Sequence, residues 1–174
     1  MKDIKYSSQN IDKLDIKNVS KSLQSDFITQ GSTIETFENR LKKKFNSNYV
    51  IAVSSGTSAL KIALMSIDLN KNDGIIVPAI TFVATINAAK NITNKIIIAD
   101  IDPSFGCITK DKLIEALKIA KKRKIKIKCL INVFYAGQTK DVYEIYKICK
   151  KNSIIIIEDS CHAIGSKYKV KNKF

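Results

Sequence analysis

Helical and strand-like hydrophobic patterns alternate along the chain. The first two patterns are helical. Residues 12–23 have apolar side chains at mixed helical spacings, and residues 33–45 place them on one stripe, with Ser32 or Thr33 as an N-cap. From residue 49 onward, short apolar runs alternate with longer amphipathic ones. The predicted strands are 49–53, 74–77, 96–100, 127–133 and 154–158, and the predicted helices between them are 57–67, 82–91, 110–120 and 141–150.

Strands separated by helices are typical of βαβ units and a mostly parallel sheet. We therefore expect an α/β fold in a single domain, with N-terminal helices in residues 1–47 and an α/β core in residues 48–174. A length of 174 residues and a hydrophobic content of 45% are sufficient for such a core and argue against disorder.

The strongest strand pattern runs from Ile154 to Ile157 and leads directly into Glu158 and Asp159. Four consecutive β-branched residues predict a strand buried on both faces. Open α/β sheets bind ligands beyond the carboxyl ends of their strands, so Asp159 is a candidate cofactor ligand. The alternative is that Asp159 only caps the turn that follows.

A Ser-Gly-Thr turn precedes the helix predicted at 57–67. Gly56 would allow a tight turn, and Thr57 and Ser58 would offer amides and hydroxyls to an anion at a helix N-terminus. The spacing matches neither the Gly-x-Gly-x-x-Gly dinucleotide motif nor the P-loop. The alternatives are therefore a phosphate site and an ordinary capped turn.

Two more turns follow predicted strands. Residues 77–85 bring Thr81 and Phe82 to the same rim, where an aromatic ring could stack on a flat heterocycle, although a single Phe is more often a core residue. Residues 134–141 form a polar loop. An anion site, an aromatic ring, a polar loop and an acid together favour a phosphorylated aromatic cofactor.

The net charge and the arginine content limit the classes of partner that the chain is expected to bind. A net charge of +14 raises the question of nucleic acid, but only Arg40 and Arg123 are arginine among the 30 basic residues, and arginine is the side chain that best reads bases and phosphates. The densest basic run, residues 118–128, is interpreted as a solvated helix end that leads into a strand. We expect no nucleic-acid partner.

Targeting and cysteine patterns are also informative. The first six residues lack the apolar core of a signal peptide, and no apolar run approaches the roughly 20 residues of a membrane span, so we expect a cytoplasmic protein without a membrane partner. No Cys-x-x-Cys pair is present, which argues against zinc or disulfides and for reduced structural thiols. The four cysteines are Cys107, Cys129, Cys149 and Cys161.

Five ordered motifs cover nearly the whole chain. They are Ser55-Gly56-Thr57-x-Ala59-Leu60, Pro78-x-x-Thr81-Phe82-x-Ala84-Thr85, Ala99-Asp100-Ile101-Asp102, Tyr135-Ala136-Gly137-Gln138 and Glu158-Asp159-x-x-His162-Ala163-x-Gly165. In this order they resemble the DegT/DnrJ/EryC1/StrS family of sugar aminotransferases, which use pyridoxal 5'-phosphate (PLP). The resemblance implies a three-layer PLP-transferase fold of type I, of which this chain would hold the large domain, incomplete at the C-terminus.

The resemblance also implies roles for single residues in binding the cofactor. Asp159 would pair with the pyridine nitrogen and keep it protonated, so that the ring acts as an electron sink. Thr57 and Ser58, beside Gly56, would bind the phosphate, and Phe82 would pack on the ring.

Further positions carry over from the family in the same way. His162 would lie beneath the cofactor, with a structural role in its turn as the alternative. The substrate side would be lined by Tyr6, Thr29 and Gln30. Family members often have His where this chain has Phe134, so we assign no polar role to that position.

The Schiff-base lysine of the family lies downstream of the Glu-Asp-x-x-His-Ala turn. Lys167, Lys169, Lys171 and Lys173 come too early in the pattern, so the resemblance places that lysine beyond Phe174 and assigns no catalytic residue to this chain. We therefore expect a truncated aminotransferase that is inactive alone. The alternatives are a non-catalytic binding or regulatory domain and a PLP-dependent sugar dehydratase in which His replaces the lysine.

Within the family, residues 6–11 and 25–31 look most like members that aminate C4 of a UDP-linked 4-keto-6-deoxy-N-acetylhexosamine on the pseudaminic acid route. This narrower resemblance implies a UDP-linked keto sugar as acceptor, an amino acid such as glutamate as donor, a homodimer and no metal.

Overall fold

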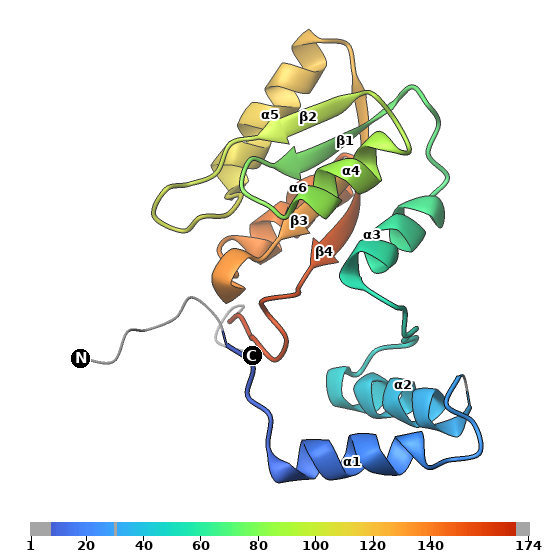
Figure 1. Ribbon diagram of the computed structural model, residues 1–174. Helices are drawn as coiled ribbons and strands as arrows, with labels where there is room; N and C mark the ends of the chain where they lie inside the picture. The colour runs from blue at the N-terminus through green and yellow to red at the C-terminus, as the bar shows by residue number, and fades with distance from the viewer. Residues whose placement is uncertain (1–7, 30, 170–174) are drawn as a thin grey trace. The chain divides into compact units, whose positions relative to one another are not determined.

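The computed structural model describes residues 8–29 and 31–169. The chain divides into two compact units, with the boundary between Ala52 and Val53. The first unit contains helices α1 (Lys13–Leu23) and α2 (Ser32–Phe45), and the second contains a parallel sheet with its covering helices (Figure 1). Each unit is described by itself.

Helix α1 begins with a reciprocal cap. The Asp12 carboxylate accepts hydrogen bonds from the amides of Leu14 and Asp15 at 2.7 and 2.9 Å, and the Asp15 carboxylate accepts one from the Asp12 amide at 2.9 Å. This capping box satisfies amides that a helix N-terminus otherwise leaves unpaired. The predicted helix at 12–23 is confirmed.

Helix α2 starts differently from the prediction. Gly31 is its N-cap, at a φ of 100° that favours glycine, and no side chain caps it. The expected cap by Ser32 or Thr33 is therefore wrong, because Ser32 is already the first helical residue. No residue of α1 or α2 is buried within the described chain, so the apolar residues that predicted both helices are exposed or, at Leu41, half-buried.

The second unit is built on a four-stranded sheet in the order β2-β1-β3-β4. All three strand pairs are parallel, so the four carboxyl ends meet at one edge, with Pro78 opposite Ala99 and Val133 opposite Asp159. The predicted α/β class with a parallel sheet is confirmed. The strands are β1 (Asp73–Pro78), β2 (Ile96–Ala99), β3 (Lys126–Val133) and β4 (Ile155–Asp159).

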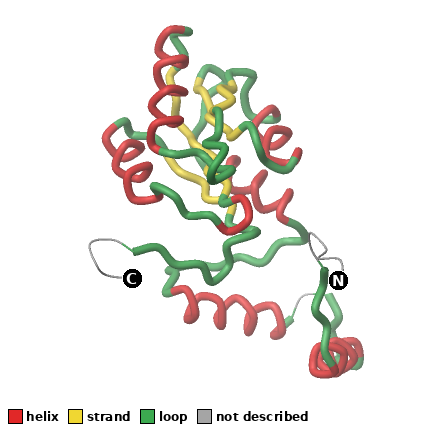
Figure 2. The backbone as a smooth tube through the Cα atoms, turned by 90° about the vertical axis from the view of Figure 1, so that its left-hand side faces the viewer, coloured by secondary structure: helices red, strands yellow, loops and turns green. Residues whose placement is uncertain are grey.

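Two layers of helices enclose this sheet (Figures 1 and 2). On one face of the sheet, Leu64 belongs to the same buried cluster as Ile131. On the other face, Leu113 belongs to the same buried cluster as Leu130. All four side chains are fully buried. The helices on the first face are α3 (Gly56–Met65) and α4 (Val83–Lys90), and those on the second are α5 (Lys110–Lys122) and α6 (Val142–Lys151). A short 3-10 turn, η1 (Tyr135–Gly137), follows β3.

Two predictions about strands are wrong, one about whether a strand forms and one about its burial. Residues 49–53 form no strand: Tyr49 and Ile51 are 85% and 76% exposed, and within the described chain no strand pairs with them. A strand pattern is local, but a strand needs a hydrogen-bonded neighbour. Strand β4 forms as predicted but is not buried on both faces: among the described residues it pairs only with β3, and Ile155 is 47% exposed.

The basic run and the cysteines have simple structural explanations. Helix α5 ends at Lys122 and β3 begins at Lys126, so the run at 118–128 is a helix end that leads into a strand, as predicted. All four cysteines are free; Cys107, Cys129 and Cys149 are buried, whereas Cys161 is exposed and therefore not a core thiol. Among the described residues, no helix has the length and apolar character of a membrane span.

Candidate cofactor site

Two turns that are far apart in sequence meet at the carboxyl edge of the sheet. Gly56 opens helix α3, and a methyl group placed on it would lie 3.6 Å from the Sγ of Cys161 in the turn after β4. This contact brings the Ser-Gly-Thr turn beside the Glu-Asp turn. The structure therefore places a candidate anion site next to a candidate acid.

The anion site is the N-terminus of α3. Ser55 caps the helix by accepting a hydrogen bond from the Ser58 amide at 3.2 Å, and the Ser58 hydroxyl lies 3.0 Å from that of Ser55 and 3.1 Å from that of Ser54. The amides of Gly56 and Thr57 precede the first intrahelical bond, and Thr57 is exposed. Free amides at the positive end of a helix bind phosphate well.

Gly56 has a different role from the one predicted. It is the first residue of α3 and is not among the glycines with positive φ, so the expected tight turn is wrong. The nearest atom to an added methyl group is the Cys161 Sγ, at an ordinary contact distance. The missing side chain therefore lets the helix N-terminus lie close to the turn after β4.

Asp159 is the last residue of β4. Its backbone oxygen accepts a hydrogen bond from the Phe134 amide at 3.1 Å, and its Oδ1 accepts one from the Cys161 amide at 3.2 Å. Asp159 therefore does cap its turn, as one of the two interpretations held. Because a carboxylate has more acceptor positions than this bond uses, Asp159 can also accept a bond from a ligand.

Glu158 points away from this site, because successive side chains of a strand alternate between its faces. It lines a groove between α6 and β4 together with Tyr146 and Lys150. Partial desolvation in this groove raises the pKa of the Glu158 carboxyl, although the residue is exposed to solvent. The two adjacent acids thus lie in different environments.

His162 holds a neighbouring turn in place. Its Nδ1 accepts a hydrogen bond from the Ala136 amide at 3.3 Å, and its ring centroid lies 6.0 Å from that of Tyr135. Gly137, at a φ of 77°, packs against the His162 carbonyl oxygen, which a methyl group would approach to 3.0 Å. These contacts support the structural interpretation of His162, which still lies beside the candidate site.

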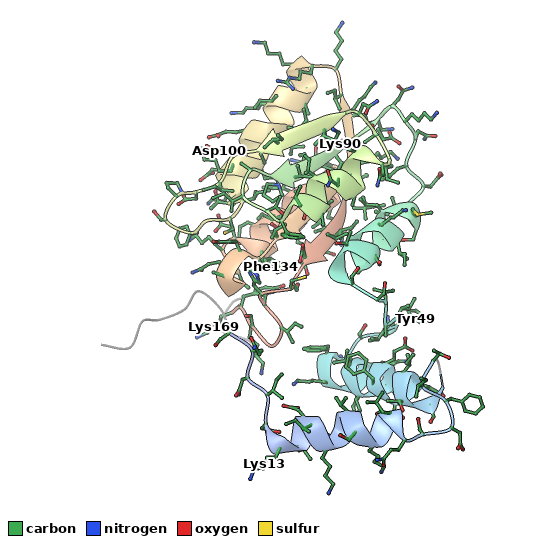
Figure 3. All side chains as sticks on the ribbon, in the orientation of Figure 1. Lys13, Tyr49, Lys90, Asp100, Phe134 and Lys169 are labelled. Carbon is green, nitrogen blue, oxygen red and sulfur yellow. The ribbon has the colours of Figure 1, made fainter. Side chains whose placement is uncertain are left out.

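The two candidate aromatic positions differ sharply. Phe82 is 72% exposed and directly precedes α4, so it is not a core residue, while its neighbour Thr81 is fixed by a 2.8 Å hydrogen bond to the buried Thr85. Phe134, which is labelled in Figure 3, is buried with Val142 and Ala163. Phe82 can therefore cover a ligand ring, whereas Phe134 cannot reach one.

The predicted substrate residues are only partly described. Thr29 is exposed in the loop between α1 and α2, in the first unit. Tyr6 and Gln30 lie outside the described residues. The predicted cofactor residues therefore lie close together, and Phe82 lies at the same edge of the sheet. The residues that lie together are Gly56, Thr57, Ser58, Asp159 and His162. The predicted roles of the substrate residues stay predictions.

Ser55 and Cys161 belong to the site but were not singled out from the sequence. The signal for Ser55 was available, since serine is among the preferred N-caps. Cys161 carried no such signal, because its importance arises from a contact with Gly56 that only the fold creates.

Comparisons with known proteins show the family of the chain. The DegT/DnrJ/EryC1/StrS aminotransferase family matches residues 9–173. The chain is 36% identical over 150 residues to a 3-oxo-glucose-6-phosphate:glutamate aminotransferase of Bacillus subtilis, covering 86% of this chain and 33% of the relative. It is 34% identical to the UDP-4-amino-4,6-dideoxy-N-acetyl-beta-L-altrosamine transaminase of Helicobacter pylori, covering 98% of this chain and 44% of the relative.

The fold is also shared with solved structures. A GDP-4-keto-6-deoxymannose-3-dehydratase with a trapped PLP-glutamate geminal diamine superposes with a TM-score of 0.84 at 27% identity, covering 99% of this chain and 44% of that one. The chain spans between a third and a half of the length of these relatives.

The family and its solved structures indicate PLP as the cofactor. The residues of this chain fit it. The α3 N-terminus can receive a phosphate, Asp159 can receive a protonated ring nitrogen, and the close approach at Gly56 brings the two turns together.

Proposed function

Because this chain belongs to the DegT/DnrJ/EryC1/StrS aminotransferase family, we propose that it is the cofactor-binding part of a PLP-dependent enzyme that transfers an amino group to a nucleotide-linked keto sugar. The observation that carries the proposal is the contact between Gly56 and Cys161, which sets the phosphate-binding helix end beside the Asp159 turn. Bound PLP supplies an electron sink for breaking bonds at the amino carbon.

Each residue of the site has a defined task in this proposal. The amides of Gly56 and Thr57 and the Thr57 hydroxyl bind the phosphate. Asp159 holds the proton on the ring nitrogen, and Phe82 covers one face of the ring. Each charge-assisted hydrogen bond, to the phosphate or to the ring nitrogen, contributes about 1.5–3 kcal/mol to binding. No lysine of this chain is assigned the covalent link to the cofactor.

The substrate and assembly follow from the resemblance of the chain to sugar transaminases. We propose a UDP-linked 4-keto-6-deoxy sugar of the pseudaminic acid route as acceptor, which the name of the Helicobacter pylori relative supports, and glutamate as donor, which the name of the Bacillus subtilis relative supports. We propose that Tyr6, Thr29 and Gln30 line the substrate side, that residues 1–47 and 48–174 make up one large domain, and that the enzyme is a homodimer. Four free cysteines suit a cytoplasmic location.

A second candidate function is sugar dehydration. The dehydratase structure that superposes with a TM-score of 0.84 supports it. The product distinguishes the two: an aminotransferase gives an amino sugar, whereas a dehydratase gives a deoxy sugar without added nitrogen. A protein that contains this chain is incubated with a nucleotide-linked keto sugar, glutamate and PLP. Mass spectrometry of the sugar product then separates these outcomes.

The cofactor site itself is tested by titrating PLP into the protein and following protein fluorescence. Binding should weaken by about tenfold or more for Asp159→Ala and for Thr57→Val, as expected for the loss of one charge-assisted bond. Asp111→Ala and Thr33→Val, exposed positions in the first turns of other helices, serve as matched controls and should bind PLP like the wild type. If the site and control variants behave alike, the proposed cofactor site is wrong.

A further inference from the structure

A groove between α5 and α6 lies at the edge of the sheet opposite the candidate cofactor site. It includes Ile127 near the start of β3 and Ile154 just before β4, whereas the site lies beyond the other ends of the strands. Its volume is about 600 Å³, and it is lined by seven apolar residues, four lysines and Asn152. This α5–α6 groove therefore has no part in the proposed function.

The floor of the α5–α6 groove is apolar. Ile114 of α5 is 38% exposed, and Leu117, Ile125 and Ile148 are half-buried against the core cluster on this face of the sheet. Four such side chains in one groove differ from the single exposed apolar residues that are common on protein surfaces. A ligand that covers them is stabilised by the burial of apolar area.

Four lysines line the same groove, and no acidic residue lines it. All four are exposed, and none forms an ion pair with any residue of 8–29 or 31–169. Lys121 and Lys151 lie in the last turns of their helices, where lysine stabilises the helix dipole. That explanation does not apply to Lys118, before the last turn of α5, or to Lys126, the first residue of β3. The positive charges are therefore available to an acidic ligand.

We propose that the α5–α6 groove binds an acidic amphipathic helix of a partner protein. Apolar anchors at positions i, i+3, i+4 and i+7 of that helix cover the floor, and acids beside this stripe face the four lysines. A nucleic acid would meet the lysines but would place charged phosphates over an apolar floor. A membrane surface is flat, whereas this floor lies between two helices.

A second copy of this chain does not offer such a helix. Each described helix from α1 to α6 contains more lysine and arginine than aspartate and glutamate. A helix of a second copy would therefore bring positive charge to the four lysines, in a chain whose net charge is already +14. The charge of the groove thus indicates a different, acidic protein.

The first experiment titrates a fluorescent peptide into protein that contains this chain and follows fluorescence anisotropy. The peptide has about 18 residues, enough for a helix, with leucine at the anchor positions and glutamate beside them. It should bind saturably, and more weakly at high salt, which screens the charges. A scrambled peptide of the same composition, and one with lysine in place of glutamate, should each bind at least about tenfold more weakly. Absence of saturable binding, or equal binding of the three peptides, would overturn the proposal.

The second experiment reverses two charges of the groove. Lys118→Glu combined with Lys121→Glu should weaken binding of the acidic peptide by about tenfold or more, because attraction becomes repulsion. Lys61→Glu combined with Lys90→Glu changes the net charge equally, but on α3 and α4, which cover the other face of the sheet. This control should bind within about twofold of the wild type. Equal losses in the two double variants would show that only net charge matters, and the proposal would be wrong.

The third experiment tests the apolar floor. Ile114→Asn should weaken binding of the peptide several-fold, since it removes apolar area from the floor. Ile119→Asn is the matched control, because Ile119 is 42% exposed on the same helix but does not line the groove. Similar binding by the two variants would contradict the proposal. Circular dichroism identifies a variant that fails to fold, in which case the lysine variants decide.

Two further measurements identify a different occupant. Vesicles of phosphatidylglycerol should not displace the peptide, and displacement would show that the groove binds a membrane. Saturating peptide should leave the sedimentation of the protein as a monomer or oligomer unchanged, and dissociation of an oligomer would show that the groove joins two copies. Either result would refute the proposal. None of these experiments uses the cofactor, so their failure leaves the proposed function standing.

Discussion

The amide of Ala136 donates a hydrogen bond to Nδ1 of His162 at 3.3 Å, and this bond ties the turn after β3 to the turn after β4. Because Nδ1 accepts, the proton of the neutral imidazole lies on Nε2. Ala136 has a φ of 52°, in the left-handed region that alanine rarely adopts, so the turn depends on support of this kind. His162 is thus a structural support of the turn that flanks the candidate site.

Replacing His162 with Ala should loosen the η1 turn. The loss of one hydrogen bond costs about 1 kcal/mol, and the Ala136 amide should exchange with solvent several-fold faster. His162→Asn is the matched control, because the amide oxygen of asparagine can occupy the place of Nδ1 and accept the same bond. Hydrogen exchange measured by NMR distinguishes the two, and equal protection of Ala136 in both variants would contradict the assigned role.

Gly56→Ala should separate folding from cofactor binding. The added methyl group meets only Cys161 Sγ at 3.6 Å, and alanine is the better helix former, so stability should be unchanged or higher by up to about 1 kcal/mol. The methyl group also fills space that the proposed cofactor needs, so PLP affinity should fall at least several-fold in a fluorescence titration.

Gly74→Ala provides the opposite control for this experiment. A methyl group on Gly74, inside β1, would overlap Ile125 and Ile127. This variant should lower the free energy of unfolding while the residues of the candidate site stay unchanged. An affinity loss in the Gly74 variant alone would argue against a cofactor near Gly56.

Leu64→Ala should destabilise the α/β unit strongly. Leu64 is fully buried on the face of the sheet that α3 and α4 cover, and truncation of a buried leucine costs about 2–5 kcal/mol. The adjacent Met65 is 64% exposed, so Met65→Ala should change stability by no more than about 0.5 kcal/mol. Urea unfolding followed by circular dichroism measures both values, and similar losses for the two variants would refute the packing of α3.

Glu158→Gln should stabilise the protein at neutral pH but not in acid. Partial desolvation raises the folded-state pKa of the exposed Glu158 above its ordinary value of 4.5, so the ionised carboxylate opposes folding once the pH exceeds that raised value. Below about pH 4 the carboxyl is protonated in both states, and the difference should vanish. Thermal unfolding at about pH 4 and pH 7.5 tests this, with the exposed Glu35→Gln as the control.

The sequence was sufficient for the parts of the fold that local patterns determine. Every described helix, and every strand that forms, begins and ends within two residues of its predicted bounds. The patterns contain this information because helices and buried strands repeat with periods of 3.6 and 2 residues. The alternation of these patterns also predicted the parallel sheet.

The missed N-cap of α2 is a local error, because Gly31 takes the place of its neighbour Ser32. The other failures depend on residues distant in sequence. Residues 49–53 carry a strand pattern without a described neighbour, and Ile155 is exposed because β4 has a partner on only one side. For the same reason the sequence predicted Asp159 and Thr57 as site residues but not Cys161, whose position between them is a product of folding. Local sequence patterns identify which functional side chains the chain contains. Tertiary contacts determine which of these side chains lie next to one another.

The strand order also has a consequence for synthesis. Strand β2 adds to one side of β1, β3 then adds to the other side of β1, and β4 adds to β3. Each strand after β1 therefore has a pairing partner that has already been synthesised when it leaves the ribosome. A chain that emerges N-terminus first can extend this sheet one strand at a time. The last strand to arrive completes the candidate site, because it delivers Asp159 and Cys161 to a helix end that was made before any strand of the sheet.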